Sequence, residues 1–204
     1  MGKSSYFLRY IDFNNVYNIA IIGNGKNTKD IDFFIKNNKK VTSFDFIEIQ
    51  YKDILFKQVN GDFNLNCNKY YNSFDIVWAC HVLEHQRNVG LFLDNVYKIM
   101  KKDALLYLSV PPYKKNIVGG HLSVWNMGLL IYNLCLANFN VKEGRFKKYG
   151  YNIFSIVSKN IDIILPDLIY DKGDLETLKY SWNKENPLFQ NINGDISEIN
   201  WFDF

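Results

Sequence analysis

The sequence predicts an α/β protein with a Rossmann-like, seven-stranded, mostly parallel sheet and helices on both faces. Short apolar segments alternate with longer amphipathic ones, which is the pattern of strands and helices in such folds. The first apolar segment ends at Gly23-Asn24-Gly25, a glycine turn typical of a buried strand that leads into a helix. The 204 residues are 48% hydrophobic and 17% aromatic, so the chain can bury a sizeable core.

Four strands are expected in the first half of the chain, each an apolar segment closed by polar or glycine residues. They are residues 16–22, 40–46, 54–59 and 74–79. Thr28 is suited to cap a helix that continues to Asn37. A further helix is expected to begin near His81, directly after the fourth strand.

The second half continues the alternation. Residues 88–100 repeat apolar side chains at the helical period, which predicts an amphipathic helix packed on the sheet. The remaining expected elements are a strand at 104–110, a helix at 126–138, and strands at 141–147 and 153–159. Seven strands result, and residues 1–159 are expected to form one domain.

Residues 160–204 are expected to form a separate C-terminal extension, because their charge and composition differ from the rest. They hold nine Asp/Glu and three Lys/Arg, a net charge of −6, whereas residues 1–159 hold 12 acidic and 21 basic residues, a net charge of +9. The extension is also rich in aromatic residues, which is unusual for a disordered tail. We therefore expect it to dock on the body or on a second subunit of a homodimer. Its aromatic residues are Tyr170, Tyr180, Trp182, Phe189, Trp201, Phe202 and Phe204.

Composition also limits the compartment and the partners. The N-terminus lacks a secretory pattern, and no apolar run is long enough to span a bilayer, so a cytoplasmic protein without a membrane partner is expected. Three cysteines without close spacing indicate reduced thiols. The sequence has no dense basic run with interleaved aromatic residues, so it gives no indication of a nucleic-acid-binding surface. The basic body suits an anionic substrate, but we favour the alternative interpretation that its charge comes from solvated lysines.

The glycine turn and Asp45 together indicate a ribose-containing ligand. Gly23 and Gly25 allow the backbone to approach a ligand closely. Asp45 follows at the end of the second strand, where an acidic side chain can accept both hydroxyls of a ribose. An ordinary turn aspartate is the alternative interpretation. The bare glycine motif lacks another glycine where Thr28 stands, which argues against tight pyrophosphate binding.

Over residues 16–159 the chain resembles class I S-adenosylmethionine-dependent methyltransferases. The matching landmarks are Gly23-Asn24-Gly25, Asp45, Gly61-Asp62-Phe63, Phe74-Asp75 and Leu83-Glu84-His85. The resemblance implies S-adenosylmethionine as cofactor, with Asp45 on the ribose and Asp62 on the adenine amino group. The cofactor-binding residues that it implies are Gly23, Asn24, Gly25, Asp45, Phe46, Asp62, Phe63, Ala79 and Cys80.

His81, Glu84 and His85 are candidate metal ligands, with His121 as a fourth. On a helix that begins near His81, the first three side chains would share one face. Imidazole and carboxylate ligands suit Mn, Fe, Co or Zn. The cluster is similar to the metal-binding segment of small-RNA 2′-O-methyltransferases and of the O-methyltransferases of ubiquinone biosynthesis. In the other interpretation, no metal binds, and Glu84 and His85 brace the loop after the fifth strand.

His121 and His85 are the candidate catalytic residues. A histidine can accept a hydroxyl proton near neutral pH, so His121 is a candidate general base, and a hydrogen-bonding role before the next helix is the alternative. The preceding residues are expected to form a substrate loop, in which Lys114 and Lys115 suit a phosphate and Tyr113 a ring. Solvent exposure would also explain the two lysines.

The expected function is methyl transfer from S-adenosylmethionine to an oxygen of a small polar acceptor. By resemblance to small methyltransferases of surface-polysaccharide synthesis, the acceptor is a sugar or a phosphorylated sugar. One rival is a metal-dependent RNA 2′-O-methyltransferase. Another is a catalytically silent binding protein, which is favoured by Ile21 and Asn27 where the family usually has an acid and a third glycine.

Overall fold

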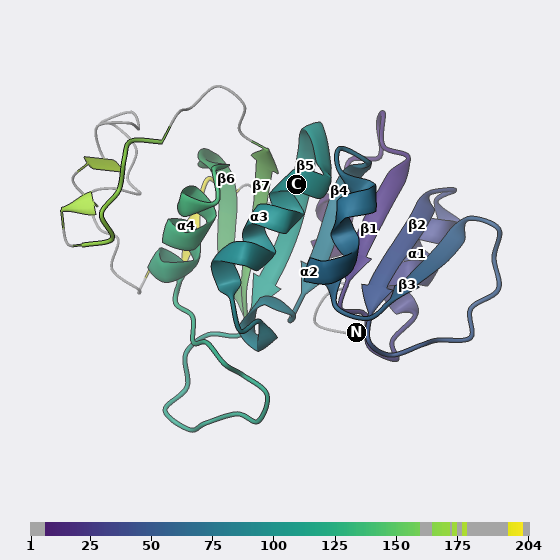
Figure 1. Cartoon of the computed structure of the whole chain (residues 1–204), viewed down its shortest axis with the longest axis horizontal. Coiled ribbons are helices and arrows are strands. Elements are labelled where there is room, and N and C mark those ends of the chain that lie inside the picture. Colours follow the sequence, from purple (N-terminus) through teal and green to yellow (C-terminus); the bar gives the residue numbers. More distant parts are fainter. Residues whose placement is uncertain (1–6, 160–164, 172, 175–176, 179–195, 202–204) are drawn as a thin grey trace.

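The computed structural model describes residues 7–159, 165–171, 173–174, 177–178 and 196–201. Within them, eight strands form one sheet in the order β3-β2-β1-β4-β5-β7-β6-β8 (Figure 1). The strands are β1 (Asn18–Ile22), β2 (Lys40–Asp45), β3 (Phe56–Asn60), β4 (Phe74–Cys80), β5 (Met100–Val110), β6 (Phe139–Tyr149), β7 (Asn152–Lys159) and β8 (Glu198–Ile199). The helices are α1 (Lys29–Lys36), α2 (Phe63–Asn66), α3 (Val89–Ile99) and α4 (Met127–Leu136).

The sheet is parallel from β3 to β5 and antiparallel beyond it. β7 runs antiparallel to β5, β6 antiparallel to β7, and β8 antiparallel to β6. The predicted α/β class and the mostly parallel sheet are therefore confirmed, with one strand more than expected. The additional strand, β8, has two residues, which is too short to produce a recognisable alternation in the sequence.

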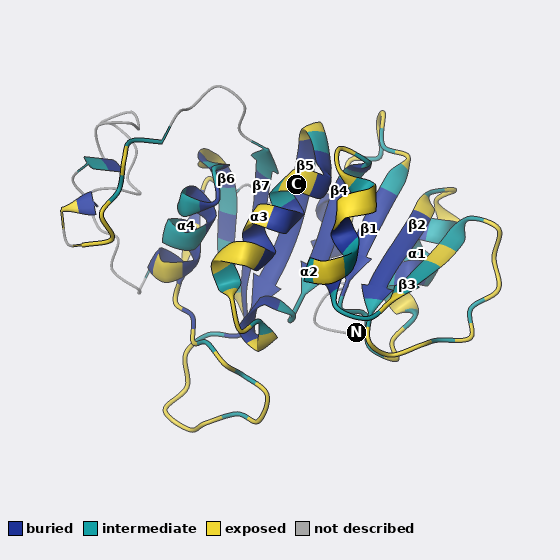
Figure 2. Cartoon of the chain, viewed as in Figure 1, coloured by how far each residue is buried: buried dark blue, intermediate teal, exposed yellow. Residues whose placement is uncertain are grey.

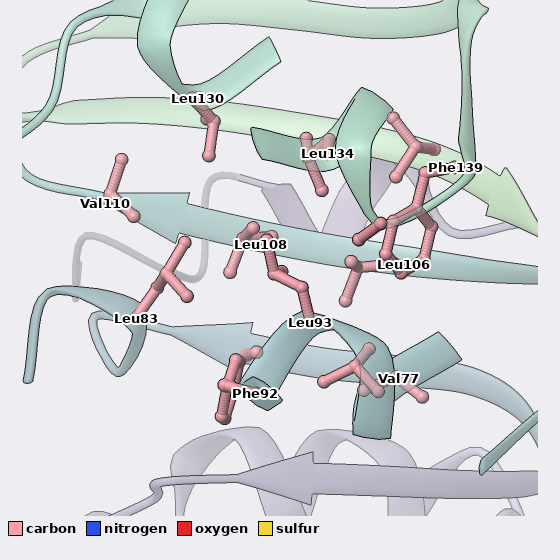
Figure 3. Close-up of a cluster of buried hydrophobic side chains, with 14 of the residues drawn as sticks. Val77, Leu83, Phe92, Leu93, Leu106, Leu108, Val110, Leu130, Leu134 and Phe139 are labelled. Carbon is pink, nitrogen blue, oxygen red and sulfur yellow. The ribbon is translucent and has the colours of Figure 1, made fainter. Parts of the chain in front are cut away.

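Alternating side chains of the strands build a core on each face of the sheet. In β1, Ala20 and Ile22 belong to the core beneath α3 and α4, whereas Ile19 and Ile21 belong to the core beneath α1. Figure 2 shows the central strands β1, β4, β5 and β7 as mostly buried, whereas the edge strand β3 is largely exposed or half-buried. In Figure 3, leucines of α3 and α4 converge on Leu106 and Leu108 of β5. Helices thus cover both faces, which holds the loops at the strand ends in fixed positions.

Asparagine caps start the two longest helices. The Asn88 side chain accepts a hydrogen bond of 2.9 Å from the backbone N–H of Leu91, and Asn126 accepts one of 2.8 Å from Leu129. Thr28 precedes α1 as predicted, but its hydroxyl donates to the Asp32 carboxylate at 3.2 Å instead of capping a backbone amide.

The helix expected from His81 is absent from this part of the structure, and the prediction was wrong. β4 continues to Cys80, His81 adopts a φ of 56°, and a single 3₁₀ turn follows at Leu83–His85. The carbonyl oxygen of Glu84 accepts the N–H groups of Leu122, at 2.7 Å, and Ser123, at 3.3 Å. Because this carbonyl bonds a distant loop instead of the next helical turn, the segment does not continue as a helix.

The described parts of the C-terminal extension contact the body. Ile199 of β8 pairs with Phe146 of β6 and is buried. The Trp201 ring meets Tyr10 edge-on, with the ring centroids 4.8 Å apart. Leu178 is also buried in the core on the α3 side. Five of the aromatic residues named above lie outside the described residues: Tyr180, Trp182, Phe189, Phe202 and Phe204.

Asp75 joins the starts of three strands and provides a test of the fold. Its carboxylate accepts the backbone N–H groups of Tyr17, at 2.9 Å, and Asn18, at 2.7 Å, and a 2.7 Å ion pair from Lys101. Burial by itself would raise the pKa of Asp75, but the hydrogen bonds and the Lys101 charge outweigh burial and lower it. A carboxylate whose pKa is lowered by folding stabilises the native state above its unfolded pKa, and this contribution is lost as the pH falls.

We expect Asp75→Asn to reduce the free energy of unfolding by about 2 kcal/mol near neutral pH, the typical value of hydrogen bonds to a charged acceptor. The difference from wild type should shrink as the pH falls below about 4, where the wild-type carboxylate also becomes protonated. Urea unfolding at a series of pH values measures both effects. Asp103→Asn removes the same charge at an exposed position and should be nearly neutral; a loss as large as that of Asp75→Asn would contradict the assignment.

Candidate cofactor cavity and active site

A cavity of about 600 Å³ lies at the carboxyl ends of β1, β2 and β3. Its volume is within the range of small-molecule sites, and ligands of open α/β sheets bind at this edge. Five predicted cofactor residues line it: Gly23, Asp45, Phe46, Asp62 and Phe63. The sequence reasoning therefore located the crevice through the residues that end each strand.

The turn strongly favours glycine at position 23. Its φ is +75°, and a Cβ atom added there would lie 2.8 Å from the Cγ2 atom of Val82. The backbone N–H of Gly23 donates to the Phe44 carbonyl oxygen at 2.9 Å, which fixes the turn against the end of β2. The missing side chain leaves the backbone open to the cavity, so a ligand can approach it closely.

Asp45 holds together the two loops that border the cavity. One carboxylate oxygen accepts the backbone N–H of Gly25 and the other accepts that of Ile47, both at 2.7 Å. Each carboxylate oxygen retains a further acceptor site. Asp45 can therefore order the glycine turn and still accept hydroxyl groups from a ligand.

The far side of the cavity combines a carboxylate with aromatic rings. Asp62 precedes α2, and one of its oxygens accepts the N–H of Asn64 at 2.8 Å, which leaves the other for a ligand. Phe63 is buried and meets Phe44 edge-on at a centroid distance of 5.3 Å, so it supports the wall. Phe46 is 76% exposed at the rim, where its ring is free to cover a flat ligand.

The other four predicted cofactor residues do not line this cavity. Asn24 accepts a hydrogen bond from the Ser43 hydroxyl, and the Gly25 N–H bonds Asp45 as described. Ala79 is fully buried. Burial raises the pKa of the Cys80 thiol, which keeps it protonated at neutral pH. These four residues shape the strand ends beside the cavity.

Several lining residues were not predicted from the sequence, and four of them lie in the segment between β4 and α3. Those four are Val82, Gln86, Arg87 and Asn88, and the others are Leu91, Ile22, Phe44, Asn64 and Leu65. Asn88 carried a usable signal, since a helix-capping residue directly after the crevice segment points the start of α3 toward the cavity.

Glu84, His85 and His121 form a cluster at this edge of the sheet. Each offers one possible ligand atom, and these atoms lie within 4.8 Å of one another. The rings of His85 and His121 are nearly perpendicular, with centroids 5.0 Å apart. The tertiary fold thus unites two adjacent residues with a third from a distant loop.

His81 stands outside this three-residue cluster, although its ring touches Glu84. Its Nδ1 atom lies 3.2 Å from Glu84 Oε1, and its Nε2 atom lies 2.6 Å from Asn152 Oδ1. Both ring nitrogens therefore face oxygen atoms, an arrangement that the doubly protonated ring satisfies. In the structure, His81 links Glu84 to the start of β7.

Glu84 is fully buried, and one of its oxygens lacks a partner in the part of the chain that the structure describes. Oε1 faces His81 and lies 3.8 Å from His85 Nε2, beyond hydrogen-bond distance. Oε2 has no hydrogen-bond partner among the described residues. A buried carboxylate oxygen without a partner is costly, so this atom is suited to a proton, a water molecule or a cation.

A hydrogen bond to the loop determines which ring nitrogen of His85 carries the proton. His85 Nδ1 lies 2.7 Å from the carbonyl oxygen of Gly120, so Nδ1 carries the proton and donates. In the neutral ring, Nε2 then presents a lone pair toward the Glu84 carboxylate. Two electron-rich atoms face each other in this form, which favours a proton or a metal ion between them.

A second cavity, of about 200 Å³, lies beneath the loop after β5. His121 lines it together with Tyr113, Lys114 and Tyr151, and the Lys114 ammonium stands 4.1 Å from the centre of the Tyr151 ring. His85 lines the larger cavity. The contact between His85 and His121 therefore joins the linings of the two cavities.

Comparison with known proteins identifies what this architecture resembles. Residues 22–108 match the family model described as a methyltransferase domain. A search of curated proteins finds no match. The fold is similar to a S-adenosylmethionine-dependent methyltransferase from Archaeoglobus fulgidus, at 16% identity and a TM-score of 0.64, covering 77% of this chain and 92% of that one.

Two further solved structures of methyltransferases have a similar fold. The 1,6-didemethyltoxoflavin-N1-methyltransferase of Burkholderia thailandensis, bound to its substrate and to S-adenosylhomocysteine, is 13% identical with a TM-score of 0.62, covering 78% of this chain and 76% of that one. A putative methyltransferase from Bacillus halodurans is 14% identical with a TM-score of 0.63, covering 79% of this chain and 100% of that one.

Among the described residues, no helix is both long and apolar enough to cross a bilayer.

Proposed function

We propose that this chain, which has the fold and the domain of S-adenosylmethionine-dependent methyltransferases, transfers a methyl group from that cofactor to an oxygen atom of a small polar acceptor. The observation that carries the proposal is the 600 Å³ cavity, which is lined by the open backbone of Gly23 and by the carboxylates of Asp45 and Asp62. A glycine backbone and two acidic side chains fit a ligand with a ribose and an adenine amino group.

For this reaction the protein has to align the acceptor with the methyl donor and to remove a proton from the acceptor. When bound, the cofactor supplies a methyl group on a sulfonium; an acceptor oxygen would attack that methyl carbon in line, and the sulfur would leave as a neutral thioether. The new bond is oxygen to carbon, and the bond that breaks is carbon to sulfur. Asp45 and Asp62 would hold the two ends of the nucleoside. A ring nitrogen of His121 would take the proton that the acceptor hydroxyl loses.

The second cavity supports a small, polar acceptor. Its volume of about 200 Å³ suits a single ring better than a polymer segment. Tyr113 and Tyr151 provide aromatic faces for a sugar, and Lys114 provides a positive charge for a phosphate. A sugar or phosphorylated sugar of surface-polysaccharide synthesis fits this lining. The proposal includes this acceptor and the transfer of the methyl group to oxygen. It also includes a cytoplasmic location and a homodimer.

Cofactor titration by calorimetry tests the proposal. We expect wild type to bind S-adenosylmethionine and Asp45→Asn to bind it about 30-fold more weakly, from about 2 kcal/mol for a lost hydrogen bond to a charged acceptor. Glu48→Gln removes one charge from the exposed loop beside Asp45 and should bind like wild type. No binding by wild type, or equal binding by Asp45→Asn, would contradict the proposed cofactor site.

Turnover separates an enzyme from a silent binding protein. The assay follows S-adenosylhomocysteine formation with a panel of sugars, sugar phosphates and single-stranded RNA. Turnover with a sugar or sugar phosphate supports the proposed acceptor, and metal-dependent turnover with RNA supports the RNA rival. Cofactor binding without turnover on any acceptor favours the silent binding protein.

A metal-assisted version of the same reaction is the second candidate. The partnerless Glu84 Oε2 and the arrangement of His85 Nε2 favour it, since imidazole and carboxylate ligands suit Zn, Mn, Fe or Co. Glu84, His85 and His121 would hold the ion, which would lower the pKa of a bound acceptor hydroxyl. Metal analysis of protein purified without a chelator or a histidine tag distinguishes the two versions.

A further inference from the structure

The loop of residues 111–126, between β5 and α4, projects from the carboxyl edge of the sheet away from the body (Figure 1). We propose that this loop binds the surface of an anionic lipid bilayer. The expectation from the sequence was that no membrane partner exists, because no segment spans a bilayer. A loop that binds at the lipid surface needs no bilayer-spanning segment, so the absence of such a segment does not exclude this kind of contact.

Exposed apolar side chains gather on this loop. Ile117 is 97% exposed and Leu122 is 61% exposed, and Tyr113 and Val124 are exposed beside them. Figure 2 shows the loop as a nearly continuous exposed segment, in contrast with the buried strands. Single exposed apolar residues are normal, but several on one projecting loop mark an interaction surface.

Backbone hydrogen bonds fix the base of the loop. The backbone N–H of Tyr113 donates to the carbonyl oxygen of Trp125 at 2.7 Å, and the Trp125 ring is buried. The N–H of Leu122 donates to Glu84 as described. A projecting loop with a closed base can insert its apolar tip into a lipid interface without unfolding the site behind it.

Charge favours lipid over a second apolar protein surface. Residues 111–126 contain Lys114 and Lys115 and no acidic residue. Arg87 is exposed at the same edge of the sheet, beside the cofactor cavity. Each lysine or arginine near an anionic bilayer strengthens binding by about fivefold, and lysine stems can lie on the interface while the ammonium stays in water.

The position of the loop gives the contact a functional meaning. The same loop carries His121 and lines the smaller cavity. A lipid-bound loop would hold that cavity against the bilayer, where an acceptor carried on a lipid could enter it. This consequence rests on the proposed function, whereas membrane binding itself does not.

Vesicle flotation with the full chain tests the proposal. We expect wild type to bind vesicles of equimolar phosphatidylcholine and phosphatidylglycerol, to release them at high salt, and to bind pure phosphatidylcholine weakly. Ile117→Asp and Leu122→Asp, made separately, should each weaken binding by at least about tenfold, because each replaces an inserted apolar side chain by a charge. No wild-type binding to the anionic vesicles would overturn the proposal.

Ile54→Asp is the matched control, since Ile54 is 98% exposed but lies before β3, at the opposite edge of the sheet. It should bind vesicles like wild type, and an equal loss in Ile54→Asp and Ile117→Asp would overturn the proposal. Cofactor titration of each variant shows that the larger cavity is intact and keeps this test separate from that of the proposed function. If wild type dimerises without lipid and Leu122→Asp abolishes the dimer, the loop is a protein contact and the lipid proposal is wrong.

Discussion

Replacing Gly23 by alanine is expected to weaken S-adenosylmethionine binding by at least about 100-fold. The positive φ of +75° costs a residue with a side chain about 1–2 kcal/mol. The added Cβ atom also meets Val82 at 2.8 Å, and such overpacking typically costs about 1–3 kcal/mol. The turn can relieve both by moving off Val82, but it then loses the shape that the cofactor requires. Binding must restore that shape, so the combined cost of about 3 kcal/mol appears in the affinity.

Gly150→Ala separates the conformational part of this effect from the contact with Val82. Gly150 also has a positive φ, of +56°, but nothing lies within 4 Å of the position of its Cβ. We expect a small loss of stability and unchanged cofactor affinity. Calorimetric titration of both variants gives the comparison. If Gly23→Ala binds as tightly as wild type, the turn does not approach the cofactor and the proposed site is incorrect.

Replacing His121 by alanine is expected to lower turnover by about 100-fold or more, the usual contribution of a general base. Cofactor affinity should stay within about twofold of wild type, because His121 lines the smaller cavity and not the larger one. Turnover is measured with whichever acceptor of the panel reacts, alongside calorimetric titration of the cofactor. Equal turnover by wild type and His121→Ala would remove His121 from the mechanism.

Metal analysis distinguishes whether His121 acts as a metal ligand or as a general base. In the metal-assisted version, wild type retains a stoichiometric ion, His121→Ala and Glu84→Gln lose it, and His81→Ala keeps it. His81→Ala is the informative control, because its ring lies outside the group formed by Glu84, His85 and His121. In the version without metal, wild type carries no stoichiometric ion and a chelator leaves turnover unchanged. Loss of the ion in His81→Ala alone would contradict the three-residue site.

The predicted cofactor residues show where local pattern is sufficient. Gly23, Asp45 and Asp62 each follow an apolar segment, and parallel strands bring their carboxyl ends to one edge, so the cavity could be anticipated from the order of the landmarks. Asn24 and Gly25 lie in the same turn and were predicted on the same grounds, yet they bond to Ser43 and Asp45 instead of lining the cavity. Which turn residue faces the ligand depends on backbone angles that residue identity alone does not determine.

The histidine cluster shows where local pattern is insufficient. A helix over His81, Glu84 and His85 was a reasonable prediction from spacing, but the Glu84 carbonyl bonds Leu122 and Ser123, and the helix does not form. His85 meets His121 through a loop 36 positions away, at a ring distance of 5.0 Å. No periodicity in the sequence encodes that contact, because it depends on how the loop after β5 folds back onto the 3₁₀ turn.

The sequence by itself therefore determined the α/β class, most of the strands and helices, and the edge of the sheet at which the site lies. These features follow from apolar periodicity and from residues such as Gly23 and Asn88, whose effects are local. Only the tertiary structure decided that His81 turns toward Asn152 while Glu84, His85 and His121 converge, and that Ile117 and Leu122 project into solvent. Those outcomes depend on contacts between residues distant in the chain, which compete with local preferences and can override them.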